Sequence, residues 1–328
     1  MIRFKARRVI NRRTGRVHSP ILEALDVKRR KYSRGVRMAC AEYATKMSYG
    51  DAATEYETGT GIHVPKRTIH TWVKELAPRL LEAYNKVKEQ KTEPKTRLAI
   101  GDSTDVRGVG YREMNQVRVL ISGDGALESL KVNEPWPETV VDVLISDDEP
   151  GLAEAVKAEW RQLCVLHAVK RLGFILWRDR VSLEERRMAL EAVKMPLFTL
   201  VRSAEKHRGD GDMDRLRWRI EWTLVMLGEA ARDLRGRGYG KAGEYLEKHA
   251  GLLVSFAELA LEGVEVPYTT NRVERLMGEV AKRCKNRWMH WGTEGLRSIL
   301  IFVLVRYTDE ELYEWFKKAY IHHEAFLC

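Results

Sequence analysis

The stretch Val140-Val-Asp-Val-Leu-Ile-Ser146, which is followed by Asp147, decides the fold class. Most of its residues are apolar and β-branched, which is typical of a strand. The apolar run is nearly continuous, so we expect a strand that is buried on both faces. A strand of this kind needs layers of other elements on both sides, which favours an α/β fold.

The segments around this strand extend the prediction to a whole sheet. A short apolar run over 98–101 predicts a strand, and residues 117–121 alternate before a turn at Gly123-Asp-Gly125. Downstream, the pattern predicts a helix over 150–160 and a further strand over 163–166. Several strands in series, followed by a strand–helix–strand unit, predict a mixed α/β sheet.

Helical periodicity dominates the second half of the chain. From His167 to about Gly263 apolar residues recur at helical spacing, with turns at Gly209-Asp-Gly-Asp and Gly236-Arg-Gly. We therefore expect an all-helical insertion. Two helices are expected to close the chain: one follows Thr270, and the other starts at Thr308 in a capping box with Glu311.

Residues 33–90 also predict helices. Ser48 is the expected N-cap of a short second helix, and a third helix opens near Pro65. Its expected buried stripe is Ile69, Trp72, Val73 and Leu76, and its polar face is Lys66, Arg67, His70, Thr71 and Lys74. The pattern favours a helix-turn-helix unit that presents this polar face to a major groove. A structural three-helix unit with an ordinary polar face is the alternative.

These patterns divide the chain into five segments. The first 35 residues carry twelve Lys/Arg and two acids, which predicts an arm lying along a phosphate backbone. The expected segments are the basic arm (1–35), the helix-turn-helix domain (36–95), the first part of the core (96–167), the helical insertion (168–265), and the last part of the core with an acidic helix and a C-terminal helix (266–328).

Composition restricts the partner and the compartment. The chain has 328 residues and a net charge of +10, so we expect a polyanionic partner, with nucleic acid before an acidic membrane surface. Its four cysteines form no CxxC pair, which fits a reducing cytosol. The longest apolar run, Ile299 to Val305, is far shorter than the roughly 20 residues of a membrane span. We therefore expect a cytoplasmic protein with no membrane partner.

Three acidic residues stand out from the others. Asp102 and Asp147 each follow an apolar strand, and the carboxyl ends of strands are where ligands bind in open sheets. Aspartates at such positions often only cap turns or helices, which is our interpretation of Asp105 and Asp148. Glu274 lies about one turn into the helix that follows Thr270, on a small, apolar face.

Three carboxylates that converge on one place repel one another unless cations lie between them. Their hard oxygen ligands suit Mg²⁺ or Mn²⁺. Two such ions, roughly 3.5–4 Å apart, can activate an attacking oxygen and stabilise a leaving one in phosphodiester displacement. Cys164-x-x-His167 lacks a second pair of zinc ligands, so we favour a buried thiol and a histidine bonded to a neighbour over a metal site.

At this point the sequence resembles the mutator-type insertion-sequence transposases of bacteria and archaea. The similarity covers 97–305 and is densest in Ser146–Leu152 with Cys164–Arg171, in Thr269–Arg275 continuing to Lys285, and in Ala99–Thr104. Residues 33–125 look more like a related insertion-sequence group. The resemblance implies an RNase H-like core and Mg²⁺-dependent cleavage and strand transfer at element ends. The family's catalytic triad falls on Asp102, Asp147 and Glu274.

We expect the partner to be double-stranded DNA, both at the element ends and at the target. The protein is expected to bind this DNA as a homodimer or higher oligomer and therefore to be located at the nucleoid. The expected contacts are those of the third helix (Lys66, Arg67, His70, Thr71, Lys74) and, near the C-terminus, Arg283, Lys285 and Arg287. Trp288 and Trp291 could stack on unpaired bases, although a place in a core or an interface is favoured.

Two other hypotheses remain open. An RNase H-like nuclease, such as a junction resolvase, would use the same chemistry without strand transfer. A non-enzymatic helix-turn-helix regulator explains residues 1–90 but gives the three acids no role.

Overall fold

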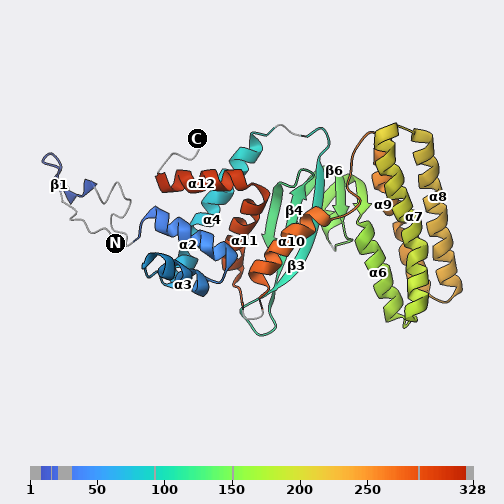
Figure 1. The fold of residues 1–328 in the computed structure, drawn as a ribbon, viewed down its shortest axis with the longest axis horizontal. Helices are drawn as coiled ribbons and strands as arrows, with labels where there is room; N and C mark the ends of the chain where they lie inside the picture. Colours follow the sequence, from blue (N-terminus) through green and yellow to red (C-terminus); the bar gives the residue numbers. More distant parts are fainter. Residues whose placement is uncertain are drawn as a thin grey trace. The chain divides into compact units, whose positions relative to one another are not determined.

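The computed structural model describes residues 9–15, 17–20, 32–91, 94–149, 151–286 and 289–322, apart from the side chains of 18 and 208–210. The chain forms two compact units (Figure 1). The first comprises Met1–Thr92, Val106–Met114 and Glu279–Cys328, and the second comprises Glu93–Asp105 and Asn115–Gly278.

A mixed five-stranded sheet forms the centre of the second unit. Its order is β5-β4-β3-β6-β7, with β4 and β5 antiparallel and β3, β6 and β7 parallel. The strands are β3 (Leu98–Arg107), β4 (Met114–Ser122), β5 (Leu127–Val132), β6 (Thr139–Ser146) and β7 (Val156–Leu163). The predicted mixed α/β sheet is confirmed. The predicted burial of β6 on both faces holds only for its last four residues, because Val140 is 63% exposed and Asp142 is exposed as well.

The segment after β6 differs from the prediction. Instead of a helix over 150–160, a single turn, α5 (Leu152–Ala155), leads directly into β7. The predicted strand over 163–166 is also wrong, because β7 ends at Leu163 and α6 begins at Val165. The composition of β7 suits a helix, but the segment pairs with β6 over its whole length, and tertiary pairing overrides a weak local propensity.

Four helices follow, as the helical periodicity predicts: α6 (Val165–Arg178), α7 (Leu183–Asp210), α8 (Met213–Gly236) and α9 (Gly240–Leu261). They lie side by side around one apolar core, which includes Leu172, Leu197, Leu227 and Leu253 (Figure 1). β7 contacts α9, where the Gln162 side chain accepts a hydrogen bond from the Phe256 N–H at 2.7 Å. α10 (Asn271–Cys284) comes next.

The first unit combines helices from both parts of the chain. They are α2 (Arg34–Lys46), α3 (Tyr49–Thr60), α4 (Lys66–Glu89), α11 (Thr293–Thr308) and α12 (Glu310–His322), together with the short antiparallel pair β1 (Val9–Ile10) and β2 (Val17–His18). Ser48 is the N-cap of α3, as predicted, and its hydroxyl accepts the Asp51 N–H at 3.1 Å.

The C-terminal part of the chain differs from the expected core segment over 266–328. α11 is buried almost all round and packs on α4 and α2, so 279–322 belongs with the N-terminal helices. The described part of this segment holds three helices instead of two. Thr308 ends α11, and the Asp309 carboxylate accepts the Leu312 N–H at 3.0 Å, so the capping box predicted at Thr308 is wrong.

Across the described residues we find no helix with the length and apolar character needed to cross a bilayer.

Candidate functional site

The register of the sheet brings Asp102 and Asp147 together. Ile100 of β3 pairs with Ile145 of β6 in parallel, and each aspartate lies two residues beyond its member of this pair. Neighbouring strands lie about 4.8 Å apart, so the two aspartates leave adjacent backbones at the same level. β3 continues to Arg107, so Asp102 lies within a strand and not at its end as predicted.

Asp102 lies where ionisation is unfavourable. Its Oδ1 accepts the Ser103 N–H at 2.7 Å. Burial nevertheless raises the pKa of Asp102 to about 6, and the negative charges of Asp147 and Glu274 add to the increase. Asp102 of β3, Asp147 after β6 and Glu274 of α10 are therefore near enough to act on one another electrostatically.

Asp147 has an unsatisfied oxygen. Its Oδ1 is buried and has no hydrogen-bond partner among the described residues. Burial raises the pKa of Asp147, the His167 imidazole lowers it, and the charges of Asp148 and Glu274 raise it again. A buried acceptor without a partner costs free energy, and a bound cation would remove that cost.

Glu274 is held in place by the residues that follow β7. The Val165 N–H donates to the Tyr268 carbonyl at 3.1 Å, and the Thr270 N–H donates to Cys164 Sγ at 3.4 Å. α10 then starts at Asn271, and the buried Thr270 hydroxyl donates to Glu274 Oε1 at 2.8 Å. The predicted position of Glu274, about one turn into a helix after Thr270, is confirmed.

Cys164 and His167 adjoin this acidic group. His167 Nδ1 lies 3.6 Å from Glu274 Oε1 and 3.3 Å from the Thr270 hydroxyl. The hydrogen bond with Cys164 raises the pKa of His167. Burial alone would raise the pKa of Cys164, but hydrogen bonds with His167 and Thr270 hold it below its usual value. The buried thiol and bonded histidine expected from the sequence are therefore present.

Cys164, His167 and Glu274 also form a possible ligand set of their own. One ligand atom from each lies within 4.8 Å of the others. A thiolate, an imidazole and a carboxylate are donors that zinc accepts, whereas Asp102 and Asp147 offer only hard oxygens. Glu274 is common to both sets.

Glu149 is a further carboxylate that the sequence did not single out. Its Oε1 accepts the Ser103 hydroxyl at 2.6 Å, which links β3 to the loop after β6. Burial raises the pKa of Glu149, and the charge of Asp147 contributes to the increase. The available signal was the run of three acids, Asp147-Asp148-Glu149, directly after a strand.

The other two aspartates considered in the sequence point elsewhere. Asp148 adopts the left-handed conformation, with φ of 68°, and its Oδ2 lies 3.6 Å from His249 Nε2 of α9. Asp105 is exposed on β3. The donor set formed by Asp102, Asp147 and Glu274 suits a hard divalent cation such as Mg²⁺ or Mn²⁺, and the unsatisfied Asp147 oxygen favours one.

The predicted DNA-facing helix is present as the first half of α4. Its stripe of Ile69, Trp72, Val73 and Leu76 is buried, as predicted. On the polar face, Lys66, Arg67 and Thr71 are exposed. His70 and Lys74 are half-buried: the His70 ring lies 5.2 Å from that of Tyr49, and Lys74 Nζ lies 2.5 Å from a Glu294 oxygen. Only part of this face is therefore open.

Arg283 requires a correction. It is 3% exposed, its Nε donates to the Ala44 carbonyl at 2.6 Å, and its guanidinium lies over the rings of Tyr49 and Trp291. It belongs to the interior of the first unit and not to a DNA-binding surface. Trp291 is buried too, in agreement with the favoured core interpretation.

Of the remaining predicted contacts, Lys285 is exposed, whereas Arg287 and Trp288 lie outside the described residues. Most of the basic arm expected over 1–35 also lies outside them.

The chain matches no protein-family model, and a comparison with curated proteins gives no significant match. The resemblance to insertion-sequence transposases therefore stays a prediction.

Proposed function

We propose that the chain is a metal-dependent DNA transposase whose Asp102, Asp147 and Glu274 hold two Mg²⁺ or Mn²⁺ ions. The observation that carries the proposal is that two adjacent parallel strands place Asp102 and Asp147 at the same level, within electrostatic reach of Glu274 on α10. Each of the two aspartates has its pKa raised by burial and by other carboxylates, and one buried Asp147 oxygen has no partner among the described residues.

The side chains around the triad support this assignment. Bound divalent ions supply charge neutralisation at the scissile phosphate and activation of the attacking oxygen. The Ser103 N–H orients the Asp102 carboxylate, and the Thr270 hydroxyl orients that of Glu274. His167 Nδ1, 3.6 Å from Glu274 Oε1, offers positive charge when protonated. Outer contacts of this kind fix the geometry of metal ligands.

The fold and the charge distribution support DNA as the substrate. A mixed sheet with one acid within β3 and one directly after the adjacent parallel strand β6, followed by a helical segment before the third acid, is compatible with an RNase H-like core. The net charge of +10, together with exposed Lys66 and Arg67 on α4 and Lys285, favours double-stranded DNA at the element ends and the target. Binding as a homodimer or higher oligomer at the nucleoid is part of this proposal.

The proposal is tested with DNA that flanks the gene, carried on a plasmid and incubated with the purified chain and Mg²⁺ or Mn²⁺. We expect metal-dependent cleavage at the element ends and products joined to target DNA. Asp147→Asn should lower cleavage on the order of a hundredfold or more, which corresponds to about 2.7 kcal/mol of transition-state free energy. DNA binding should remain, because the variant loses an acid and no cation.

Asp105→Asn is the matched control, because it removes an exposed carboxylate from β3 and should cleave like the wild type. A fully active Asp147→Asn variant would exclude the triad. Cleavage without joined products would identify an RNase H-like nuclease. DNA binding that is independent of metal, with no cleavage at all, would identify a regulator.

A further inference from the structure

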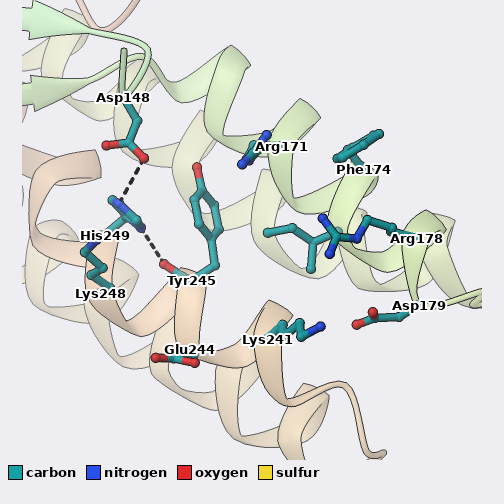
Figure 2. A pocket seen from close by; sticks show the side chains of 11 residues that line it. Asp148, Arg171, Phe174, Arg178, Asp179, Lys241, Glu244, Tyr245, Lys248 and His249 are labelled. Carbon is teal, nitrogen blue, oxygen red and sulfur yellow. Dashed lines mark hydrogen bonds and ion pairs between the residues drawn. The ribbon is translucent and has the colours of Figure 1, made fainter. Parts of the chain in front are cut away.

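A cavity of about 330 Å³ lies between α6 and α9, next to the loop that follows β6. Arg171, Phe174 and Arg178 of α6 form one wall, and Lys241, Tyr245 and Lys248 of α9 form the other (Figure 2). His249, which is 3% exposed, contacts Asp148 at the end near the sheet. None of the roles assigned above uses this cavity.

Four cationic side chains line the cavity. Arg171 and Arg178 are two helical turns apart on one face of α6, and Lys241 and Lys248 repeat this spacing on α9. All four are exposed, and none forms an ion pair with a described residue. They are available to a ligand that carries phosphate.

The charge of the lining limits the size of that ligand. Three acids, Asp148, Asp179 and Glu244, also line the cavity, so the positive charge of the four cations is only slightly in excess. A ligand with one or two negative charges fits this balance better than a long stretch of duplex. The volume is also at the lower end of small-ligand pockets, which is enough for one nucleotide unit.

Two aromatic side chains offer surfaces for a base. Phe174 is 46% exposed, and the Arg171 guanidinium lies 5.9 Å from the centre of its ring. Tyr245 is half-buried on the opposite wall and packs against His249, with 4.4 Å between the ring centres (Figure 2). Aromatic faces beside unpaired cations are the combination that binds single-stranded nucleic acid.

The cavity adjoins the candidate metal centre. Asp148, which lines the cavity, directly follows Asp147, and Arg171 is one helical turn after His167 on α6. Burial raises the pKa of Tyr245, and the charges of Asp148 and Asp147 add to the increase, so the phenol lies within electrostatic reach of both carboxylates. A strand held at the metal centre therefore has this cavity beside it.

We propose that the cavity binds one unpaired nucleotide of the DNA strand at the metal centre. The base lies against Phe174 and Tyr245, and the phosphate contacts Arg171 and Arg178. The inference rests on the proposed function, because that function makes DNA the ligand and places a strand at Asp147.

The test uses the full-length wild-type chain in EDTA, so that no strand is cut, and a 12-nucleotide oligodeoxythymidine that carries one 5-iododeoxyuridine. Irradiation links this base to an aromatic side chain with which it is in contact, and mass spectrometry locates the linked peptide. We expect the link at Phe174 or Tyr245. The same sequence as a duplex should compete poorly, because its bases are stacked and paired.

Variants measure the contribution of each wall. Phe174→Leu should weaken oligonucleotide binding, measured by fluorescence anisotropy, by about tenfold, since stacking on an aromatic side chain is worth about 1–3 kcal/mol per base. Arg178→Gln should also weaken binding, because it removes a charge-assisted contact with the phosphate. Trp218→Leu and Arg187→Gln are matched controls, because they remove an exposed aromatic and an exposed cation elsewhere on the helical insertion. Both should bind like the wild type.

Cross-links only outside the cavity, or wild-type affinity in both cavity variants, would overturn the inference. The plasmid cleavage assay is run in parallel and separates it from the proposed function. If the wild type cleaves DNA but the oligonucleotide binds outside the cavity, the proposed transposase function stands and the nucleotide site is rejected. If the oligonucleotide cross-links at Phe174 or Tyr245 but no DNA is cleaved, the nucleotide site stands and the transposase function is rejected.

Discussion

At the scale of single residues, Asp102 illustrates what the candidate site costs the protein without metal. Burial raises the pKa of its carboxyl group to about 6, and the negative charge of Asp147 adds to the increase. At neutral pH the folded state must therefore hold a charge that its surroundings disfavour, whereas the unfolded chain holds it in water. A cluster with this property is stabilised by a cation and not by further burial.

This cost predicts a pH-dependent difference in stability between the metal-free wild type and Asp102→Asn. The folded-state pKa of Asp102 lies above the ordinary value near 4. The free-energy cost of ionising Asp102 in the folded state is therefore absent below about pH 4 and fully present above about pH 6. As pH rises through this range, the wild type should lose on the order of 2 kcal/mol relative to the variant. The side chain is partly exposed, which keeps the loss below the value for full burial.

Urea unfolding in EDTA at pH 4.5 and pH 7.5 measures this difference, and Asp105→Asn serves as the control. A gap between the wild type and Asp102→Asn that is the same at both pH values would show that Asp102 does not titrate as described.

Several features of the site could be predicted from the sequence because they depend on local patterns. Acids after apolar runs identified Asp102 and Asp147, and the capping position of Thr270 located Glu274 within its helix. Glu149 and Arg283 could not be assigned in this way. Their surroundings come from contacts with Ser103 and Ala44, which are remote in sequence.

At the scale of elements, the approach of α5 to β3 determines where Asp102 lies. A Cβ added to Gly101 would lie 2.7 Å from Leu152 Cδ2 and 3.3 Å from Leu120 Cδ1. Leu152 is fully buried, so it has little room to move. A side chain at position 101 would therefore force Leu152 to shift, and the next residue is the first acid of the site.

Gly101→Ala should destabilise the chain by about 1–3 kcal/mol through overpacking. It should also lower the cleavage rate of the folded protein, because Asp102 moves with the strand. Replacing Leu152 with Ala in the same chain removes the clashing methyl groups. The double variant should recover part of the cleavage activity, as measured by a double-mutant cycle. Wild-type stability and activity in Gly101→Ala would show that this contact does not position the site.

The largest error at this scale concerns β7. Residues 156–163 are rich in residues that suit a helix, yet they form β7 because β6 offers a complete row of backbone partners. The predicted start of α12 is wrong by one residue for a local reason: Thr308 is the last residue of α11, and Asp309 supplies the cap. Residues 156–163 form a strand and not a helix because of long-range pairing, and the local periodicity of the sequence carries no information about that pairing.

At the scale of the whole molecule, the first unit is built from segments that are remote in sequence. α11 packs on α2 and α4. One part of the surface of the 24-residue helix α4 is therefore covered by α11, and another part is the predicted DNA face. The ion pair between Lys74 and Glu294 neutralises one of the cations that the sequence assigned to DNA. No local pattern could reveal this contact, because the partner lies about 220 residues away.

Glu294→Gln should therefore strengthen non-specific binding of duplex DNA. It releases Lys74 to a phosphate, so affinity should rise a few-fold and the slope of log K against log salt should steepen by about 1. Glu82→Gln is the matched control, because it removes the same charge from a Lys86 ion pair farther along α4. Equal effects of the two substitutions would show that net charge alone matters and that Lys74 does not reach DNA.

The central claim is that Asp102, Asp147 and Glu274 share divalent cations, and Mn²⁺ binding to the full-length chain measures it most directly. Titration followed by electron paramagnetic resonance should show saturable binding of two ions that Mg²⁺ displaces. Asp147→Asn and Glu274→Gln should each weaken binding by about tenfold or more, or about 1.4 kcal/mol, while Asp105→Asn binds like the wild type. Identical isotherms for the wild type and all three variants would contradict the account.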